Sequence, residues 1–294
     1  MARNGLFART RAPQSATYPS SPSPQERLDA AVAGLENLDP ALSAKSGLWP
    51  LQRIALNVIA LMALAAIFFA PAVIIVVLQL AFAVVFAMLL SVRVLAIHHA
   101  LTKPPAEGLA LGAFAIPDDG ALPTYTVLIA LHAEVPVVPQ LVAALRALDY
   151  PHDKFDVVFA LEADDLPTQA ALLEEGLPAN MRLLVVPEGL PRTKPRALCY
   201  GLTFARGEYI VVYDAEDLPA PDQLRCAAGA FAAGGGDVGC LQASLAINNA
   251  RYSWLTAQFA IEYTALFDAV LPALAGHGLP VPLGGTSNHF PGIR

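Results

Sequence analysis

The sequence predicts a mainly parallel, Rossmann-like α/β sheet with helices on both faces, preceded by a transmembrane helical hairpin. Three observations predict this fold class. An uncharged apolar run lies between Arg53 and Arg93. From Tyr125 onward, short β-branched runs alternate with helical runs, which is typical of βαβ units. Acidic residues follow three of these runs, at the strand ends where parallel sheets bind their ligands.

The composition limits the class of protein. Of the 294 residues, 55% are hydrophobic and only 15% are charged, so the chain is too apolar for an ordinary soluble domain and long enough for one domain plus a membrane element. The net charge of -7 excludes a nucleic-acid partner, because no basic stripe is available to replace phosphate counterions. The three cysteines form no CxxC pair and receive no metal or disulfide role.

The composition divides the chain into four segments, 1–50, 51–97, 98–123 and 124–294. The first is rich in Pro, Ser and Ala and is expected to be disordered, apart from a stretch with helical spacing that would lie on the membrane or pack on a partner. That spacing is carried by Leu28, Val32, Leu35 and Leu38. The third is a linker dense in Pro and Gly.

Residues 51–97 are expected to form two transmembrane helices, because one span needs about 20 apolar residues. Pro71 should divide them, since proline lacks the backbone donor that a helix interior requires. Basic residues flank the run and none lies within it, so the N-terminus and the following domain should both be cytoplasmic. The expected location is the cell inner membrane, as a multi-pass protein. The alternative is a pair of buried core helices.

The domain is read as alternating strands and helices in chain order. Strands are expected at 125–131, 155–161, 181–187 and 208–214, and helices at 138–150, 167–177, 194–207 and 221–235. A further helical run, 252–274, carries aromatic and apolar residues on several faces. It suits a helix at the membrane interface, and equally a core helix of the domain.

Acidic residues gather at the ends of the expected strands. They are Glu134 after the first strand, Glu162, Asp164 and Asp165 after the second, and Asp214, Glu216 and Asp217 after the fourth. Like charges this close cost stability unless a cation lies among them. Mg²⁺ or Mn²⁺ bridging a pyrophosphate would supply that cation. The alternatives are a solvated turn at 214–217 and, for Glu134 and Asp165, a helix N-cap, a role that suits Asp165 in particular.

Five segments then occur in a fixed order: IALHAE, FALEADD, RTKPRALCYGLTFARGEYIVVYDAEDLP, CLQASLAINN and LGGTSNHF. On these segments, residues 125–290 resemble the cytoplasmic domain of family 2 glycosyltransferases, and most of all the membrane-bound branch that contains bacterial cellulose synthase and hyaluronan synthase. The resemblance implies a GT-A-type fold and a metal-dependent enzyme. Such an enzyme would transfer a sugar from a UDP-sugar to a polysaccharide or lipid-linked acceptor.

The resemblance also implies roles for individual residues. Nucleotide-sugar binding would fall to His132, Glu134, Glu162, Asp164, Lys194 and Asp214, and the metal to Asp214, Glu216 and Asp217. The sugar or acceptor side would be formed by Gln242, Gly284, Gly285, Thr286, Ser287 and Asn288. Other interpretations stay open at this point: a surface lysine at Lys194, a backbone partner at Gln242, and packing roles at His132 and His289.

The sequence departs from the family pattern in two places. Glu216 stands where the family has the second Asp of its metal motif, which leaves Asp217 as an alternative ligand. The chain ends at Arg294, before the family's T-E-D motif, so the general base is expected beyond that residue. A general base contributes about 10²–10⁴-fold, and a truncated chain would be impaired. The alternatives are an inactive nucleotide-sugar-binding or scaffold protein and, less favoured, a nucleotidyltransferase.

Overall fold

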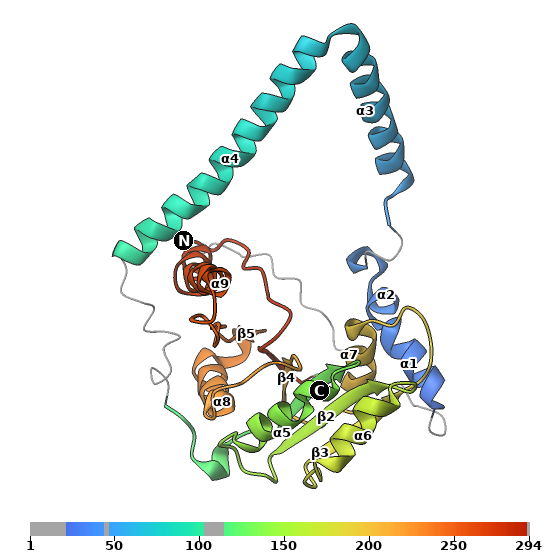
Figure 1. The fold of residues 1–294 in the computed structure, drawn as a ribbon, viewed down its shortest axis with the longest axis vertical. Coiled ribbons are helices and arrows are strands. Elements are labelled where there is room, and N and C mark those ends of the chain that lie inside the picture. The colour runs from blue at the N-terminus through green and yellow to red at the C-terminus, as the bar shows by residue number, and fades with distance from the viewer. Residues whose placement is uncertain (1–21, 44–46, 103–114, 293–294) are drawn as a thin grey trace, which may run out of the picture.

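The computed structural model describes residues 22–43, 47–102 and 115–292, which form an α/β domain and two long apolar helices (Figure 1). The sheet has six strands in the order β3-β2-β1-β4-β6-β5. Strands β3, β2, β1 and β4 are parallel, and β6 is antiparallel to both β4 and β5. The bounds are β1 (Tyr125–Leu131), β2 (Phe155–Glu162), β3 (Met181–Val186), β4 (Tyr209–Tyr213), β5 (Leu241–Gln242) and β6 (Asn288–Pro291). The predicted fold class is confirmed.

Helices pack on both faces of the sheet. Helices α5 (Val138–Arg146), α6 (Leu166–Glu174) and α8 (Gln223–Gly234) contribute to one buried core, together with alternate residues of β1, β2 and β4. Helix α7 (Lys194–Leu202) packs on the other face. Helix α7 ends at Leu202, five residues before the glycine at which the sequence predicted its end.

The two-residue period of the strands decides which side chains face α7. In β2, Phe159 and Leu161 join the core with α5, whereas Val158 and Ala160 lie in the clusters on the α7 face. Because successive side chains of a strand point to opposite faces, Glu162 at the end of β2 falls on the α7 face. The same alternation in β4 places the residue after Tyr213 on that face.

The expected helical stretch before the apolar run is present and packs on the domain. Helix α1 (Pro24–Val32) begins at a capping box formed by Ser23 and Glu26, and α2 (Gly34–Leu38) follows it. Leu28 is buried among residues of β2, β3 and α7, and the guanidinium of Arg27 lies 4.9 Å from the ring centre of Phe204. The stretch therefore contacts the domain itself. The disorder expected for its N-terminal neighbour concerns residues 1–21, outside the described residues.

Two helices are long and apolar enough to cross a membrane, α3 (Pro50–Phe69) and α4 (Pro71–Thr102). They meet at Ala70, so the predicted break at Pro71 is confirmed. None of the residues in their most apolar windows is buried, which makes the alternative of buried core helices wrong. Helix α4 has 32 residues, about 48 Å at 1.5 Å per residue, and exceeds the roughly 30 Å of a hydrocarbon core.

A third apolar segment lies near the end of α4. It comprises α9 (Trp254–Ala265), a π-helical turn η5 (Leu266–Val270) and α10 (Leu271–Gly276), and it too is long and apolar enough to cross a membrane. Only 11% of its most apolar window is buried. The segment is therefore not a core helix of the domain. It contacts α4, where the rings of His99 and His277 lie 5.7 Å apart.

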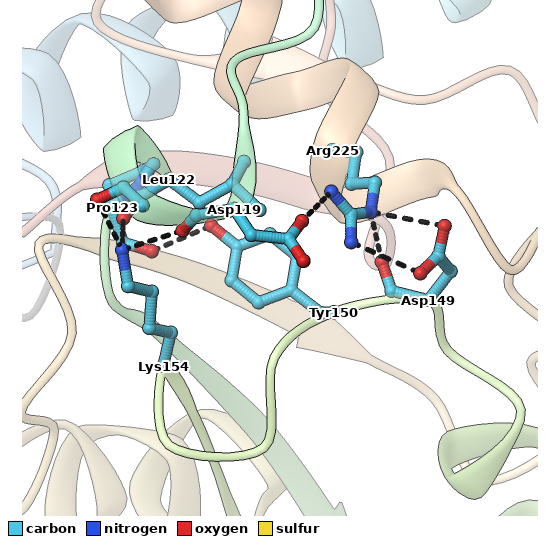
Figure 2. Close-up of polar contacts among 8 residues, drawn as sticks. Asp119, Leu122, Pro123, Asp149, Tyr150, Lys154 and Arg225 are labelled. Carbon is cyan, nitrogen blue, oxygen red and sulfur yellow. Dashed lines mark hydrogen bonds and ion pairs between the residues drawn. The ribbon is translucent and has the colours of Figure 1, made fainter.

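The segment that enters the domain is fixed by two basic side chains (Figure 2). Nζ of Lys154 donates 2.8 Å hydrogen bonds to three carbonyl groups, those of Asp119, Gly120 and Leu122. Arg225 on α8 donates to the Asp119 carboxylate at 2.7 Å and to the backbone carbonyl of Asp149 at 2.7 Å. The last residues of the expected linker, 98–123, are thus attached to the sheet domain, and its first five belong to α4.

Candidate active site

Four chain segments meet at the edge of the sheet where the parallel strands end. They are residues 132–134 after β1, 162–165 at the end of β2, 214–217 after β4, and 284–288 leading into β6. The last joins them because β6 runs antiparallel to β4 with Asn288 opposite Val212, so β6 begins where β4 ends. All four carry residues that the sequence singled out, and α7 begins beside them.

Lys194 and Asp214 form the centre of this edge. Lys194 is the first residue of α7, and its ammonium group is ion-paired with Asp214 Oδ1 and lies 3.4 Å from the carbonyl oxygen of Gly285. The positive end of the helix dipole disfavours a cation in the first turn of a helix. A nearby anion is therefore needed to stabilise the Lys194 ammonium group. Burial lowers the pKa of Lys194, and the carboxylates of Asp217 and Glu216 oppose that change.

Glu162 is held by a residue that the sequence analysis missed, Arg196. The Arg196 guanidinium donates to both carboxylate oxygens of Glu162, at 3.0 and 2.9 Å, and also to the carbonyl of Pro187. Both side chains of this pair are only 6% exposed. Positions two apart on a helix point in different directions, so Lys194 reaches β4 while Arg196 reaches β2. The alternation of side chains along β2 could have revealed Arg196, because it places Glu162 on the face of the sheet that α7 covers.

The two acids after Glu162 have different partners. Asp164 forms a 2.5 Å ion pair with Arg192, and both side chains are well exposed. Asp165 is the N-cap of α6 and also accepts a 2.7 Å hydrogen bond from the N–H of Ala133, a residue with φ of 57°. Burial alone would raise the pKa of Asp165, but the hydrogen bonds from Ala133 and Thr168 lower it below its usual value. The N-cap interpretation of Asp165 is confirmed.

The residues after β1 are less constrained. The backbone N–H of Glu134 donates to Thr168 Oγ1 at 3.2 Å, and its side chain is half-buried, whereas His132 is exposed. Both residues lie between the ends of β2 and β4, since β1 separates those strands. Their contact with a nucleotide stays a prediction.

The turn after β4 separates the three expected metal ligands. The carboxylate of Asp217 accepts a 2.8 Å hydrogen bond from the N–H of Asp214 and contacts the hydroxyl of Thr286. Burial is the main reason why the pKa of Asp217 is raised; Glu216 adds to the rise, while Thr286 and Lys194 oppose it. Glu216 is exposed. Asp217 therefore also links the end of β4 to the segment that leads into β6.

The donor chemistry of this turn fits one class of metal site. Within residues 22–43, 47–102 and 115–292, no group of three or more His, Cys, Asp or Glu side chains is placed to hold a metal ion. A cage made only of protein ligands is thus not preformed there. Asp214 and Glu216 offer oxygen donors only, and one or two carboxylates plus substrate phosphate is the usual coordination of Mg²⁺.

Two amide side chains at the β5–β6 end of the site have unsatisfied oxygens. Gln242 and Asn288 are opposite each other in the β5–β6 pair, and the side-chain oxygens of both are buried without a hydrogen-bond partner. Asn288 Nδ2 donates to the carbonyl of Gly284 at 2.6 Å, and a Cβ on Gly284 would lie 2.8 Å from Gln242 Nε2. Buried acceptors without donors are costly, and both of these oxygens lie where β5 pairs with β6.

Thr286 and Ser287, expected on the sugar or acceptor side, are buried and join strands. The N–H of Ser287, at φ of 54°, donates to the carbonyl of Val212 at 2.7 Å. Thr286 Oγ1 accepts from the N–H of Asp214 at 3.1 Å. Gly285 contributes the carbonyl near Lys194. The glycine-rich segment therefore forms one wall of the edge through its backbone.

His289 is a packing residue. It is 1% exposed in β6, its Nδ1 lies 3.0 Å from the hydroxyl of Tyr125, and the two rings meet edge to face. Burial lowers the pKa of His289 from 6.5 to about 4. The packing interpretation of this histidine is confirmed.

The buried His289 predicts acid sensitivity of the fold. Because its folded pKa is below its unfolded pKa, protonation favours the unfolded chain; the stabilisation is complete above pH about 6.5 and is lost as the pH falls toward about 4. The loss amounts to up to about 3 kcal/mol at 1.36 kcal/mol per pKa unit. Thermal unfolding of the full chain in detergent should show a steeper acid decline for the wild type than for His289→Gln. Equal declines would contradict the prediction.

A known protein family matches the part of the chain that contains most of these site residues. The sequence model described as "Glycosyltransferase like family 2" matches residues 123–286, more than half of the chain. The chain belongs to glycosyltransferase-like family 2. The match covers β1 to β5 and stops at Thr286, so the edge that carries Lys194, Asp214 and Gln242 lies within the family 2 domain.

Several solved structures are similar to this chain. The mannosyltransferase PcManGT from Pyrobaculum calidifontis, in complex with GDP-mannose and Mn²⁺, is 23% identical, with a TM-score of 0.41 over 67% of this chain and 61% of that chain. Glucosyl-3-phosphoglycerate synthase from Mycobacterium tuberculosis, with Mn²⁺, UDP and glucosyl-3-phosphoglycerate, is 17% identical, with a TM-score of 0.37 and coverages of 59% and 58%. S. aureus TarS 1–349 is 19% identical, with a TM-score of 0.36 and coverages of 43% and 37%.

This chain spans less than two thirds of the length of each of these three proteins. No curated protein sequence matches it. The family assignment accordingly rests on the match over residues 123–286.

Proposed function

We propose that this family 2 domain is a membrane-anchored, metal-dependent glycosyltransferase that takes a sugar from a UDP-sugar. The acceptor would be a polysaccharide or lipid-linked glycan, with the domain on the cytoplasmic side of the inner membrane. One observation carries the proposal: the ammonium group of Lys194, at the start of α7, is paired with Asp214 at the end of β4. This places a cation and a carboxylate together where a parallel sheet binds its ligand.

Lys194 and the N-terminus of α7 suit a diphosphate. Free N–H groups and the positive end of the helix dipole bind anions, and a lysine adds a mobile point charge. In the structure this charge is neutralised by Asp214. On donor binding, Lys194 would exchange Asp214 for a phosphate oxygen, which frees the carboxylate.

Asp214 and Glu216 would then hold Mg²⁺ or Mn²⁺ together with the diphosphate. When bound, the ion neutralises the charge that builds on the leaving nucleoside diphosphate. Asp217, already held by the Asp214 N–H and the Thr286 hydroxyl, would keep the turn in shape. It remains the alternative second ligand.

The rest of the donor would lie on either side of this centre. Glu162, held as a carboxylate partner of Arg196, would take the ribose or base, with His132, Glu134 and Asp164 nearby. On the other side, the unsatisfied oxygens of Gln242 and Asn288 would accept hydrogen bonds from sugar hydroxyls. The glycines 284 and 285 would let the sugar approach the backbone.

The test is metal-dependent nucleotide binding. Calorimetric titration of UDP into the full chain in detergent should give heat with Mn²⁺ and much less without it. Asp214→Asn should weaken the binding by more than about tenfold, the loss that even an outer-shell partner of a metal causes. Asp153→Asn, the same change at an exposed residue before β2, is the matched control and should bind as the wild type does.

Three results would count against the proposal. They are UDP binding that ignores Mn²⁺, equal affinities of Asp214→Asn and Asp153→Asn, and no UDP binding by a chain that circular dichroism shows to be folded. Titration of GDP in parallel tests the choice of base, because a preference for GDP would overturn the UDP-sugar assignment alone.

A further inference from the structure

We propose that the segment formed by α9, η5 and α10, residues 254–276, lies along the membrane surface at the level of the lipid headgroups and does not cross the bilayer. The inference goes beyond the proposed transfer reaction, because it concerns where the protein meets lipid. It rests on the exposure of the segment, on the strands that flank it, and on its contact with α4.

The first step is the exposed apolar surface of the segment. Large apolar and aromatic side chains are exposed along the segment, and Tyr252 precedes them. They are Trp254, Leu255, Phe259, Ile261 and Leu266, with exposures from 38% to 75%. The less exposed positions recur at helical spacing and include Ala260, Tyr263 and Phe267. An exposed apolar surface of this size marks a site of contact with lipid or another protein.

The second step excludes a crossing. Strand β5 precedes the segment and β6 follows it, and these two strands are hydrogen-bonded to each other with Gln242 opposite Asn288. A single helix that crossed the bilayer would place its two flanks on opposite sides, about 30 Å apart. Residues 277–287, which contain no helix or strand, would then have to return through lipid with unpaired backbone groups, which bilayers do not tolerate.

The charges of the segment agree with a shallow position. Glu262 and Asp268 are both exposed on the segment. A carboxylate at the centre of a spanning helix costs roughly 2.5–3.5 kcal/mol on insertion scales, whereas at headgroup level it stays in water. Trp254, at the first residue of α9, suits the same depth, because tryptophan prefers the membrane–water interface.

The third step fixes the height of the segment through α4. Arg93 is the first charged residue after the apolar run, and it marks the end of the part of α4 that can lie in hydrocarbon. Ala96 and His99 follow three and six residues later, about 5 and 9 Å further along the helix. Ala96 is 2% exposed, and a Cβ on Gly276 of α10 would lie 2.6 Å from the His99 ring. The headgroup layer extends roughly 5–8 Å beyond the hydrocarbon core on each side. Ala96 therefore lies within this layer, and the contact between His99 and Gly276 lies at its outer edge.

This position connects the membrane surface to the candidate active site. Leu279, Val281 and Leu283 continue from α10 with exposed apolar side chains, and Gly284 follows directly. The wall of the site that carries Gly285 and Asn288 is thus continuous with the segment in contact with lipid. An acceptor carried by the membrane would reach the sugar side of the site along this path.

The natural tryptophans provide the test, because the chain has two, Trp49 and Trp254. In the full chain reconstituted in phosphatidylcholine vesicles, Trp49→Phe leaves Trp254 as the sole reporter. We expect its emission to fall in vesicles whose lipids carry bromine at shallow acyl positions, and to be shielded from iodide in the buffer. A control reporter on α6 is Leu173→Trp in a chain without the other tryptophans. Its emission should not fall in the brominated vesicles, and it should be quenched by iodide in the buffer.

A second reporter separates the two orientations. Leu266→Trp, in the chain lacking both native tryptophans, places the probe in the middle of the segment. A segment parallel to the surface gives the strongest quenching from shallow bromines at 254 and at 266 alike. Strongest quenching at 266 by bromines near the bilayer centre would show a crossing and overturn the proposal, as would free access of iodide to Trp254. Phe259→Trp serves in place of Leu266→Trp if that variant does not fold.

Discussion

Replacement of Arg196 by methionine is expected to destabilise the α/β domain by about 3–5 kcal/mol, the usual cost of leaving a buried charge without its partner. The partner is Glu162, whose two carboxylate oxygens both accept from Arg196 in a pair that is only 6% exposed. Methionine fills most of the volume but offers no donor. Glu162 is then left almost completely buried between β2 and α7 without its donor.

Urea unfolding of the full chain in detergent, followed by pulse proteolysis, measures this effect. The matched control is Arg192→Met, which removes an ion pair to Asp164 whose side chains are 44% and 40% exposed; its cost should be at most about 1 kcal/mol. Glu162→Gln combined with Arg196→Met should be clearly more stable than the sum of the two single effects predicts. Strict additivity, or equal costs at 192 and 196, would show that the buried pair does not have this role.

Gly207→Ala is the second large effect, and we expect a loss of about 3–5 kcal/mol in the free energy of unfolding, at the upper end for a single substitution. A Cβ on Gly207 would lie 2.3 Å from the backbone nitrogen of Thr126 and 2.5 Å from the carbonyl oxygen of Tyr209. These are main-chain atoms of β1 and β4, which cannot move without breaking the sheet. The N–H of Gly207 also donates to Thr126 Oγ1 at 2.8 Å.

The same pulse-proteolysis measurement tests this variant. Gly239→Ala is the control, because a Cβ there would meet nothing within 4 Å, and its midpoint should stay close to that of the wild type. A Gly207→Ala chain as stable as the control would mean that β1 and the turn before β4 are further apart than the structure has them.

Much of the sheet could be predicted from the sequence because its four parallel strands are long, apolar and separated by helices. Strand β6 could not. Its four residues include Asn288 and Pro291, and they become a strand through pairing with β4 and β5 rather than through their own propensity. Helix α7 was predicted too long for a related reason. The sequence predicts that the helix ends at Gly207, whereas this glycine is required by its close approach to β1.

The position of the candidate site could be predicted from the sequence, but the contacts within it could not. The acids could be placed at strand ends because parallel strands finish at one edge of a sheet. Their partners could not, since Glu162 and Arg196 lie 34 residues apart and meet only after β2 and α7 have packed. The sequence also does not show which way neighbouring side chains point. Asp217 points toward Thr286, while its neighbour Glu216 is exposed.

The attachment of Asp119 to Lys154 and Arg225 sets where an independently folding fragment has to begin. A fragment cut at Thr124 would remove three carbonyl acceptors of one ammonium group and the carboxylate that Arg225 holds. It would also expose the start of β1, where the N–H of Tyr125 donates to the Lys154 carbonyl at 2.8 Å. Expression of the sheet without its membrane helices should therefore start upstream of Asp118.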